Sequence, residues 1–207
     1  MAPTGVVYDF TETFEGSEVD SQTETGYDNA SWTSSNAANT PRDTTTPSPL
    51  AGTYSWRSTT NGTLLRAVSA TANFYAYFIA HVVTKTDNSL FFEVRNSVPT
   101  TIGSIRTRAT DAMRIEHGGT VSSNTSNGTF AAGSTYHVWF EWEKGTGADG
   151  VYRLYVSSTA TKPAASISLT NGAATTDVAF VRFSGPTVAI FDNFVYDTST
   201  PIGSDPV

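Results

Sequence analysis

The chain has 207 residues and a formal net charge of −7, with 19 acidic and 12 basic side chains. Nucleic acid is not an expected partner, because binding it requires a basic surface that neutralises phosphates. The sequence contains no cysteine, which excludes disulfides and thiolate metal sites. The longest apolar run, residues 74–83, is interrupted by His81 and is too short to cross a bilayer. We therefore predict one domain over residues 1–207 and no membrane partner.

Apolar and polar residues alternate with a period of two along most of the chain, which predicts an antiparallel all-β fold. The first strand is expected over residues 5–10. Residues 16–49 are rich in Ser, Thr, Asn and Pro and predict a long irregular loop anchored by Tyr27 and Trp32. Further strands are expected over residues 53–58, 63–69, 74–83, 90–95, 101–109, 113–116, 136–143, 151–156, 165–169, 177–183 and 188–196. Residues 198–207 are expected to form an extended C-terminal tail that crosses the surface or docks on a neighbouring chain.

The hairpin made by residues 136–143 and 151–156 shows the clearest alternation, and its two apolar faces must coincide. That condition places Trp142 opposite Tyr152 and Phe140 opposite Leu154. On the other face Trp139 then lies beside Tyr155, and Glu141 beside Arg153. The strand over residues 74–83 is apolar on both faces, which predicts a central strand that is covered on both sides.

Three motifs resemble the concanavalin A-like, laminin-G-like jelly rolls of the lectin and glucanase superfamily. They are the opening Phe10-Thr-Glu-Thr-Phe14-Glu15-Gly16 with Trp32 downstream, the hairpin of residues 136–156, and the closing Ala189-Ile-Phe-Asp192-Asn193-Phe-Val-Tyr196. The resemblance implies an antiparallel β-sandwich. A galactose-binding-like jelly roll shares the first and last motifs and is the alternative fold.

The resemblance also implies that the first and last strands lie side by side. Carboxylates from the two strands can then share a structural Ca²⁺, which would place Glu15 and Asp192 at a calcium site. Calcium takes six to eight oxygen ligands, so backbone carbonyls and residues such as Asp9, Glu12 or Asn193 would have to contribute. The alternative is that Asp192 bonds to nearby backbone amides.

Aromatic and charged residues on several strands could form one wall that stacks on sugar rings and bonds to their hydroxyls. The same residues could instead pair across strands for stability, or be covered by the long loop. The candidate saccharide-binding residues are Tyr75, Tyr77, His81, Glu93, Arg95, His137, Trp139, Glu141, Arg153 and Tyr155.

Two families of related fold carry catalytic runs that can be sought in the sequence. The Glu-x-Asp-x-x-Glu run of laminarinase-type glycosidases is absent. Phe91-Phe-Glu93-Val-Arg95 is similar to the arginine strand of polysaccharide lyases, but their Gln-x-His element is missing and Gln22 is the only glutamine. The missing runs lead to the expectation that the chain is not an enzyme.

The sequence leaves three functions open. The first is a non-catalytic structural or adhesive surface module, virion-associated as a decoration, head-fibre or tail protein, with other virion or surface proteins as partners in an oligomeric assembly. The second is a carbohydrate-binding module for cell-surface glycans. The third is a polysaccharide lyase or glycoside hydrolase domain. The N-terminal residues do not resemble a secretory signal, so we expect a virion or extracellular surface location reached without one.

Overall fold

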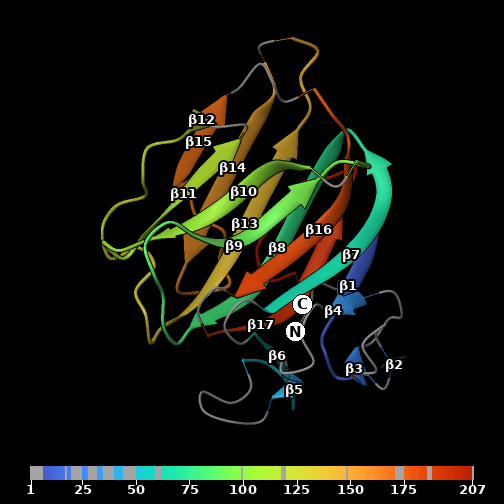
Figure 1. Ribbon diagram of the computed structural model, residues 1–207, viewed down its shortest axis with the longest axis vertical. Helices are drawn as coiled ribbons and strands as arrows, with labels where there is room; N and C mark the ends of the chain where they lie inside the picture. The colour runs from blue at the N-terminus through green and yellow to red at the C-terminus, as the bar shows by residue number, and fades with distance from the viewer. Residues whose placement is uncertain are drawn as a thin grey trace.

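The computed structural model describes residues 7–16, 18–19, 25–27, 32–34, 40–43, 50–58, 62–98, 100–117, 120–147, 149–170, 175–185 and 188–206. Within these residues every regular element is a β-strand, and no helix is long and apolar enough to cross a membrane. The strands form two antiparallel sheets packed face to face, which confirms the predicted β-sandwich (Figure 1).

One sheet, here called sheet I, has the order β15-β14-β13-β8-β17-β6-β5, with β1 paired to β17. Its strands are β1 (Phe10–Glu12), β5 (Thr40–Asp43), β6 (Ser55–Ser58), β8 (Asn73–Val82), β13 (Thr135–Glu143), β14 (Val151–Ser157), β15 (Ile167–Thr170) and β17 (Ala189–Asp197).

The other sheet, sheet II, has the order β12-β11-β10-β9-β16-β7-β4 and lies in front of sheet I in Figure 1. Its strands are β4 (Trp32–Ser34), β7 (Gly62–Thr71), β9 (Ser89–Arg95), β10 (Thr101–Arg108), β11 (Ala112–His117), β12 (Thr120–Val121) and β16 (Val178–Gly185). A small separate sheet pairs β2 (Glu18–Val19) with β3 (Thr25–Tyr27).

The predicted hairpin register is confirmed at all four pairs. In the β13–β14 pair, Trp142 lies opposite Tyr152, Phe140 opposite Leu154, Trp139 opposite Tyr155, and Glu141 opposite Arg153. Strand β8 is central, as predicted, between β13 and β17, and most of its side chains are buried on both faces. The first and last strands also lie side by side, because β1 pairs with β17.

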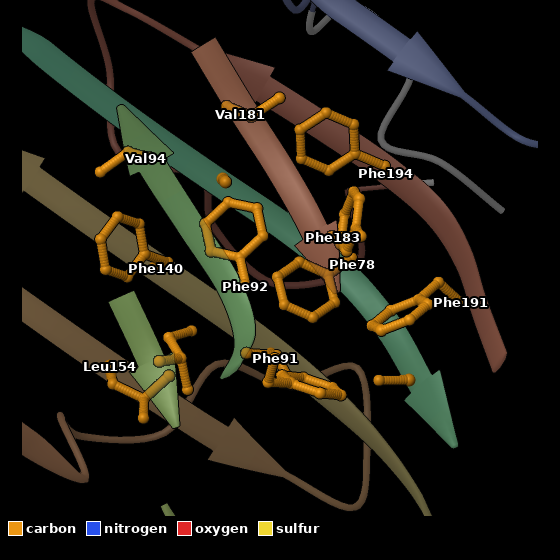
Figure 2. Packing of buried hydrophobic residues seen from close by; sticks show 14 of the residues in the cluster. Phe78, Phe91, Phe92, Val94, Phe140, Leu154, Val181, Phe183, Phe191 and Phe194 are labelled. Atoms are coloured by element: carbon orange, nitrogen blue, oxygen red, sulfur yellow. The ribbon is translucent and has the colours of Figure 1, made fainter. Parts of the chain in front are cut away.

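Aromatic rings from both sheets fill the space between them. Phe183 of sheet II packs against Phe78 and Phe191 of sheet I, with ring centroids 5.1 and 4.8 Å apart. Phe92 lies 5.2 Å from both Phe78 and Phe183 (Figure 2). This interdigitated core fixes the alternation of each strand, so the remaining side chains of each strand must point outward.

Two segments differ from the sequence-based expectation. The first described strand begins at Phe10 rather than spanning residues 5–10. Residues 16–49 are not only loop, because β4 and β5 extend the edges of both sheets and β2 pairs with β3. Trp32 is a buried anchor, since its indole Nε1 donates to Glu12 Oε2 at 2.9 Å, whereas the side chain of Tyr27 lies outside the described residues.

Candidate functional site

The ten candidate residues do not form one wall. Eight of them lie on the outer face of sheet I, but Glu93 and Arg95 lie on the outer face of sheet II. The prediction of a single surface is therefore wrong. Strand β9 follows β8 in the sequence but pairs with β10 and β16, so its outward side chains lie on the opposite side of the sandwich.

The outer face of sheet I is covered by the C-terminal segment of the same chain. Trp139 is fully buried, and its Nε1 donates to the carbonyl oxygen of Gly203 at 2.9 Å. Ile202 is only 2% exposed and packs with Tyr75, Tyr77 and Trp139. The tail thus docks on its own domain, and the stacking faces of these rings are taken by protein contacts.

The polar candidates on sheet I bond mainly to one another. The Tyr77 hydroxyl lies 2.8 Å from His137 Nδ1, and burial lowers the pKa of His137, with Asp205 opposing the effect. His81 Nδ1 lies 3.0 Å from Thr135 Oγ1.

Glu141 is the centre of a second group on this face. Lys162 Nζ donates to its Oε1 at 2.7 Å, and Tyr155 and Arg153 donate to its Oε2 at 2.9 and 3.2 Å. Burial alone would raise the pKa of Glu141, but these three donors lower it overall. The group links β13 to β14, and Lys162 also donates to the Ile202 carbonyl oxygen of the tail at 2.8 Å, in agreement with the alternative that these residues pair across strands.

The outer face of sheet II carries a different kind of surface. Five of the nine arginines of the chain project from it, each with 17% to 27% of its side chain exposed. We call this surface the arginine face; its members are Arg95, Arg106, Arg108, Arg114 and Arg182. Three carboxylates, Glu93, Glu116 and Asp87, make ion pairs with these five arginines, so the basic groups of this set exceed the acidic ones by two on a chain whose net charge is −7.

Glu93 organises one end of the arginine face. Its carboxylate is 1% exposed, and its Oε1 makes ion-pair contacts with Arg182 Nε at 2.5 Å and Arg95 Nε at 3.4 Å, without the alignment of a hydrogen bond. Thr101 Oγ1 donates to Oε2 at 2.5 Å. The terminal nitrogens of Arg95 and Arg182 donate no hydrogen bond to any described residue, so they are available to a ligand.

Glu116 organises the other end of the arginine face in the same way. It makes ion pairs with Arg106 Nε and, at 3.5 Å, with Arg114 Nη2, and its side chain is 25% exposed. The Asn88 carbonyl oxygen accepts from Arg106 Nη1 at 3.1 Å, and Asn88 Oδ1 accepts from Arg114 Nη2 at 2.6 Å. Asn88 and Glu116 therefore hold both guanidinium groups on the surface.

The sequence-based search missed Arg106, Arg108, Arg114 and Arg182. A usable signal was present, because each of these arginines alternates with residues that point into the core. Arg182 stands between Val181 and Phe183, and Arg114 stands between two other core residues, Met113 and Ile115. An arginine at that place in a strand must lie on the outer face.

Of the two carboxylates predicted at a calcium site, Glu15 lines a small cavity of about 270 Å³ with Thr13, Ala51, Gly52 and Asn193, and Asp192 does not line it. Glu15 Oε1 accepts from the backbone amides of Thr53 and Tyr54 at 2.6 and 2.7 Å. Gly52 has φ of 60°, and a Cβ there would lie 2.4 Å from Glu15 Oε1, so only glycine permits this approach.

Asp192 is fully buried beside that cavity. Its Oδ2 accepts from the Ala51 amide and the Ser55 hydroxyl, both at 2.8 Å, and its Oδ1 accepts from the Asn193 amide. Protein donors thus occupy most of the oxygens that a cation would need. No group of three or more His, Cys, Asp or Glu among the described residues could hold a metal, so these side chains alone do not fit calcium, and its binding stays a prediction.

Asp192 is expected to make stability depend on pH. Burial raises its pKa to about 7, with Glu15 adding to the effect and the accepted hydrogen bonds opposing it. The pKa of an Asp in an unfolded chain is ~3.9. Between about pH 4 and 7 the Asp192 carboxyl therefore holds a proton in the folded state that it loses in the unfolded state. The free energy of unfolding should fall by up to about 4 kcal/mol as pH rises through that window.

Urea denaturation between pH 4 and 8 measures this slope. Asp192→Asn should flatten it, whereas an unchanged slope in the variant would contradict the assignment to Asp192. Adding CaCl₂ at pH 8 tests the calcium prediction, because bound calcium would stabilise the wild type and not the variant.

The fold is shared by solved structures of low sequence identity. The cellulose-induced protein Cip1 aligns with a TM-score of 0.60 and 12% identity over 84% of this chain and 93% of its own. An endo-β-1,4-glucuronan lyase from the fungus Trichoderma reesei aligns with a TM-score of 0.57 and 12% identity over 97% and 99%. A mutant of alginate lyase Aly36B in complex with alginate trisaccharide aligns with a TM-score of 0.51 and 13% identity over 70% and 82%.

No protein-family model matches the sequence, and no curated protein matches it. The class that the solved structures define is the jelly-roll β-sandwich, and a concanavalin-like jelly roll fits this chain. Two of these three proteins are polysaccharide lyases, which contradicts the expectation of a non-catalytic, virion-associated surface module and the expectation that the chain is not an enzyme. The expected partners and location stay predictions.

Proposed function

We propose that this protein binds an acidic, uronate-containing polysaccharide on the arginine face and cleaves it by β-elimination. The observation that supports this most directly is the pair Arg95 and Arg182, whose terminal nitrogens donate to no described residue while buried Glu93 fixes their position. Planar guanidinium groups bind carboxylates with two parallel hydrogen bonds, which suits a chain of uronates. The glucuronan and alginate lyases of the same fold act on polymers of this class.

The chemistry of β-elimination explains why arginines are useful. A base takes the proton from C5, which places negative charge next to the sugar carboxylate; the electrons of the broken C5–H bond then form a C4=C5 double bond, and the 4-linked oxygen leaves with the electrons of the C4–O bond and is protonated by water. A guanidinium bonded to that carboxylate stabilises the developing charge. The described residues of the arginine face include neither Tyr nor His, so we assign this face binding and charge neutralisation and assign no base.

Incubation with glucuronan and with alginate, followed by ultraviolet absorbance of the unsaturated product, tests the reaction. Calorimetric titration of the same polymers tests binding, with neutral cellulose oligosaccharides as the control. We expect binding and product with an acidic polymer only. Binding without product would refute the elimination step, and equal affinity for neutral and acidic chains would refute the role of the arginine face.

A further inference from the structure

The arginine face contains the same arrangement twice. In one cluster Glu93 lies between Arg182 and Arg95, and in the other Glu116 contacts both Arg106 and Arg114. We call them the Glu93 cluster and the Glu116 cluster. In each, one carboxylate orients two guanidinium groups that project from neighbouring strands of sheet II.

The spacing of the two clusters follows from the strand register. Ser104 of β10 pairs with Glu93 of β9 on one side and with Glu116 of β11 on the other. The two carboxylate residues therefore lie in one row across the sheet, two strand spacings or ~10 Å apart. Between them stands only the small, buried side chain of Ser104, so no large residue of this row separates the clusters.

Each cluster keeps donors for a ligand. Arg95 and Arg182 use only Nε in their contacts with Glu93. Arg106 uses Nε and Nη1, and Arg114 uses Nη2 alone, which leaves one terminal nitrogen on each without a described acceptor. Each cluster can thus present at least two N–H-bearing nitrogens to one carboxylate.

We infer that each cluster is one carboxylate subsite and that the polysaccharide runs across the strands of sheet II to occupy both. This rests on the proposed function and adds the number, spacing and orientation of its subsites. Successive sugars of an extended 1,4-linked chain turn over, so the same edge faces the protein at every second sugar. Two subsites about one disaccharide apart therefore recognise the first and third sugars, and the smallest ligand that fills both is a trisaccharide.

Calorimetric titration with glucuronan oligosaccharides of two to five sugars tests the inference. The second charge-assisted contact contributes about 1.5–3 kcal/mol, so affinity should increase about ten- to hundredfold from di- to trisaccharide. It should then change little from three to five sugars. Arg182→Lys and Arg114→Lys keep a positive charge beside each carboxylate but lose the planar guanidinium with its parallel N–H donors. Each variant alone should abolish the increase in affinity from di- to trisaccharide.

Arg153→Lys on the opposite face of the sandwich is the matched control and should leave the increase intact. A gradual rise with length, or an increase that survives both cluster variants, would overturn the two-subsite inference while leaving the proposed function standing. Failure of long glucuronan and alginate to bind would refute the proposed function itself. Tighter binding of sulfated oligosaccharides of equal length would overturn the assignment to carboxylates.

Discussion

Replacing Arg95 and Arg182 together with alanine is expected to reduce the affinity for polyuronate about ten- to hundredfold. The charge-assisted contact of this cluster with one carboxylate contributes about 1.5–3 kcal/mol, and every tenfold change in affinity corresponds to about 1.4 kcal/mol. Both side chains are partly exposed and their terminal nitrogens donate to no described residue, so the loss should appear in ligand affinity. Calorimetric titration at low ionic strength measures it, because added salt screens exposed charges.

The double alanine variant also removes both cations beside buried Glu93, so a second variant must separate binding from folding. Replacing both residues with lysine keeps positive charge next to Glu93 and loses only the planar guanidinium groups. We expect this variant to bind about tenfold more weakly, with its thermal unfolding nearly unchanged. Arg153→Ala on sheet I should bind as the wild type does. If Arg153→Ala weakened binding as strongly as the double variant, the ligand would bind to the outer face of sheet I, and the assignment of binding to the arginine face would be wrong.

The strand pattern could be predicted because local alternation decides it. In the β13–β14 hairpin, large apolar residues occupy alternate positions on both strands, and only one register buries them together. Strand β8 could be placed at the centre of a sheet for a similar reason, since a strand that is apolar on both faces must be covered on both. These are properties of one strand or of two neighbours.

The composition of the site could not be predicted in the same way. Alternation shows which residues of a strand share a face, but it does not show which sheet the strand joins. Glu93 and Arg95 were grouped with Trp139 for this reason, although β9 and β13 belong to different sheets. The Glu93 cluster also needs Arg182, which is 89 positions after Glu93 in the chain and reaches it only because β16 pairs with β9.

The covering of sheet I depends on contacts that carry no local pattern. Ile202 is the one large apolar residue between Pro201 and Pro206, yet it seals the aromatic surface of Tyr77 and Trp139. The bond from Trp139 to the Gly203 carbonyl involves backbone, which any residue at position 203 would supply. A tail of this composition predicts an extended segment, but not the surface on which it lies.

Glu93→Ala is expected to lower the free energy of unfolding by about 3 kcal/mol, because burial rather than charge alone decides the cost of losing a carboxylate here. Glu93 is 1% exposed and stands between Arg95 and Arg182. Removing one member of a buried ion group leaves the others without compensation and costs about 3–5 kcal/mol, and the partial exposure of both arginines places this case at the lower end.

Glu116→Ala is the matched control, since Glu116 also contacts two arginines but 25% of its side chain is exposed. Water can solvate Arg106 and Arg114 after the change, so the cost should stay below about 1 kcal/mol. Urea denaturation of the two variants at neutral pH gives both values. Equal losses of unfolding free energy in the two variants would show that Glu93 contributes no more to stability than Glu116. A much larger loss in Glu93→Ala would support Glu93 as the residue that holds Arg95 and Arg182 in position for a ligand.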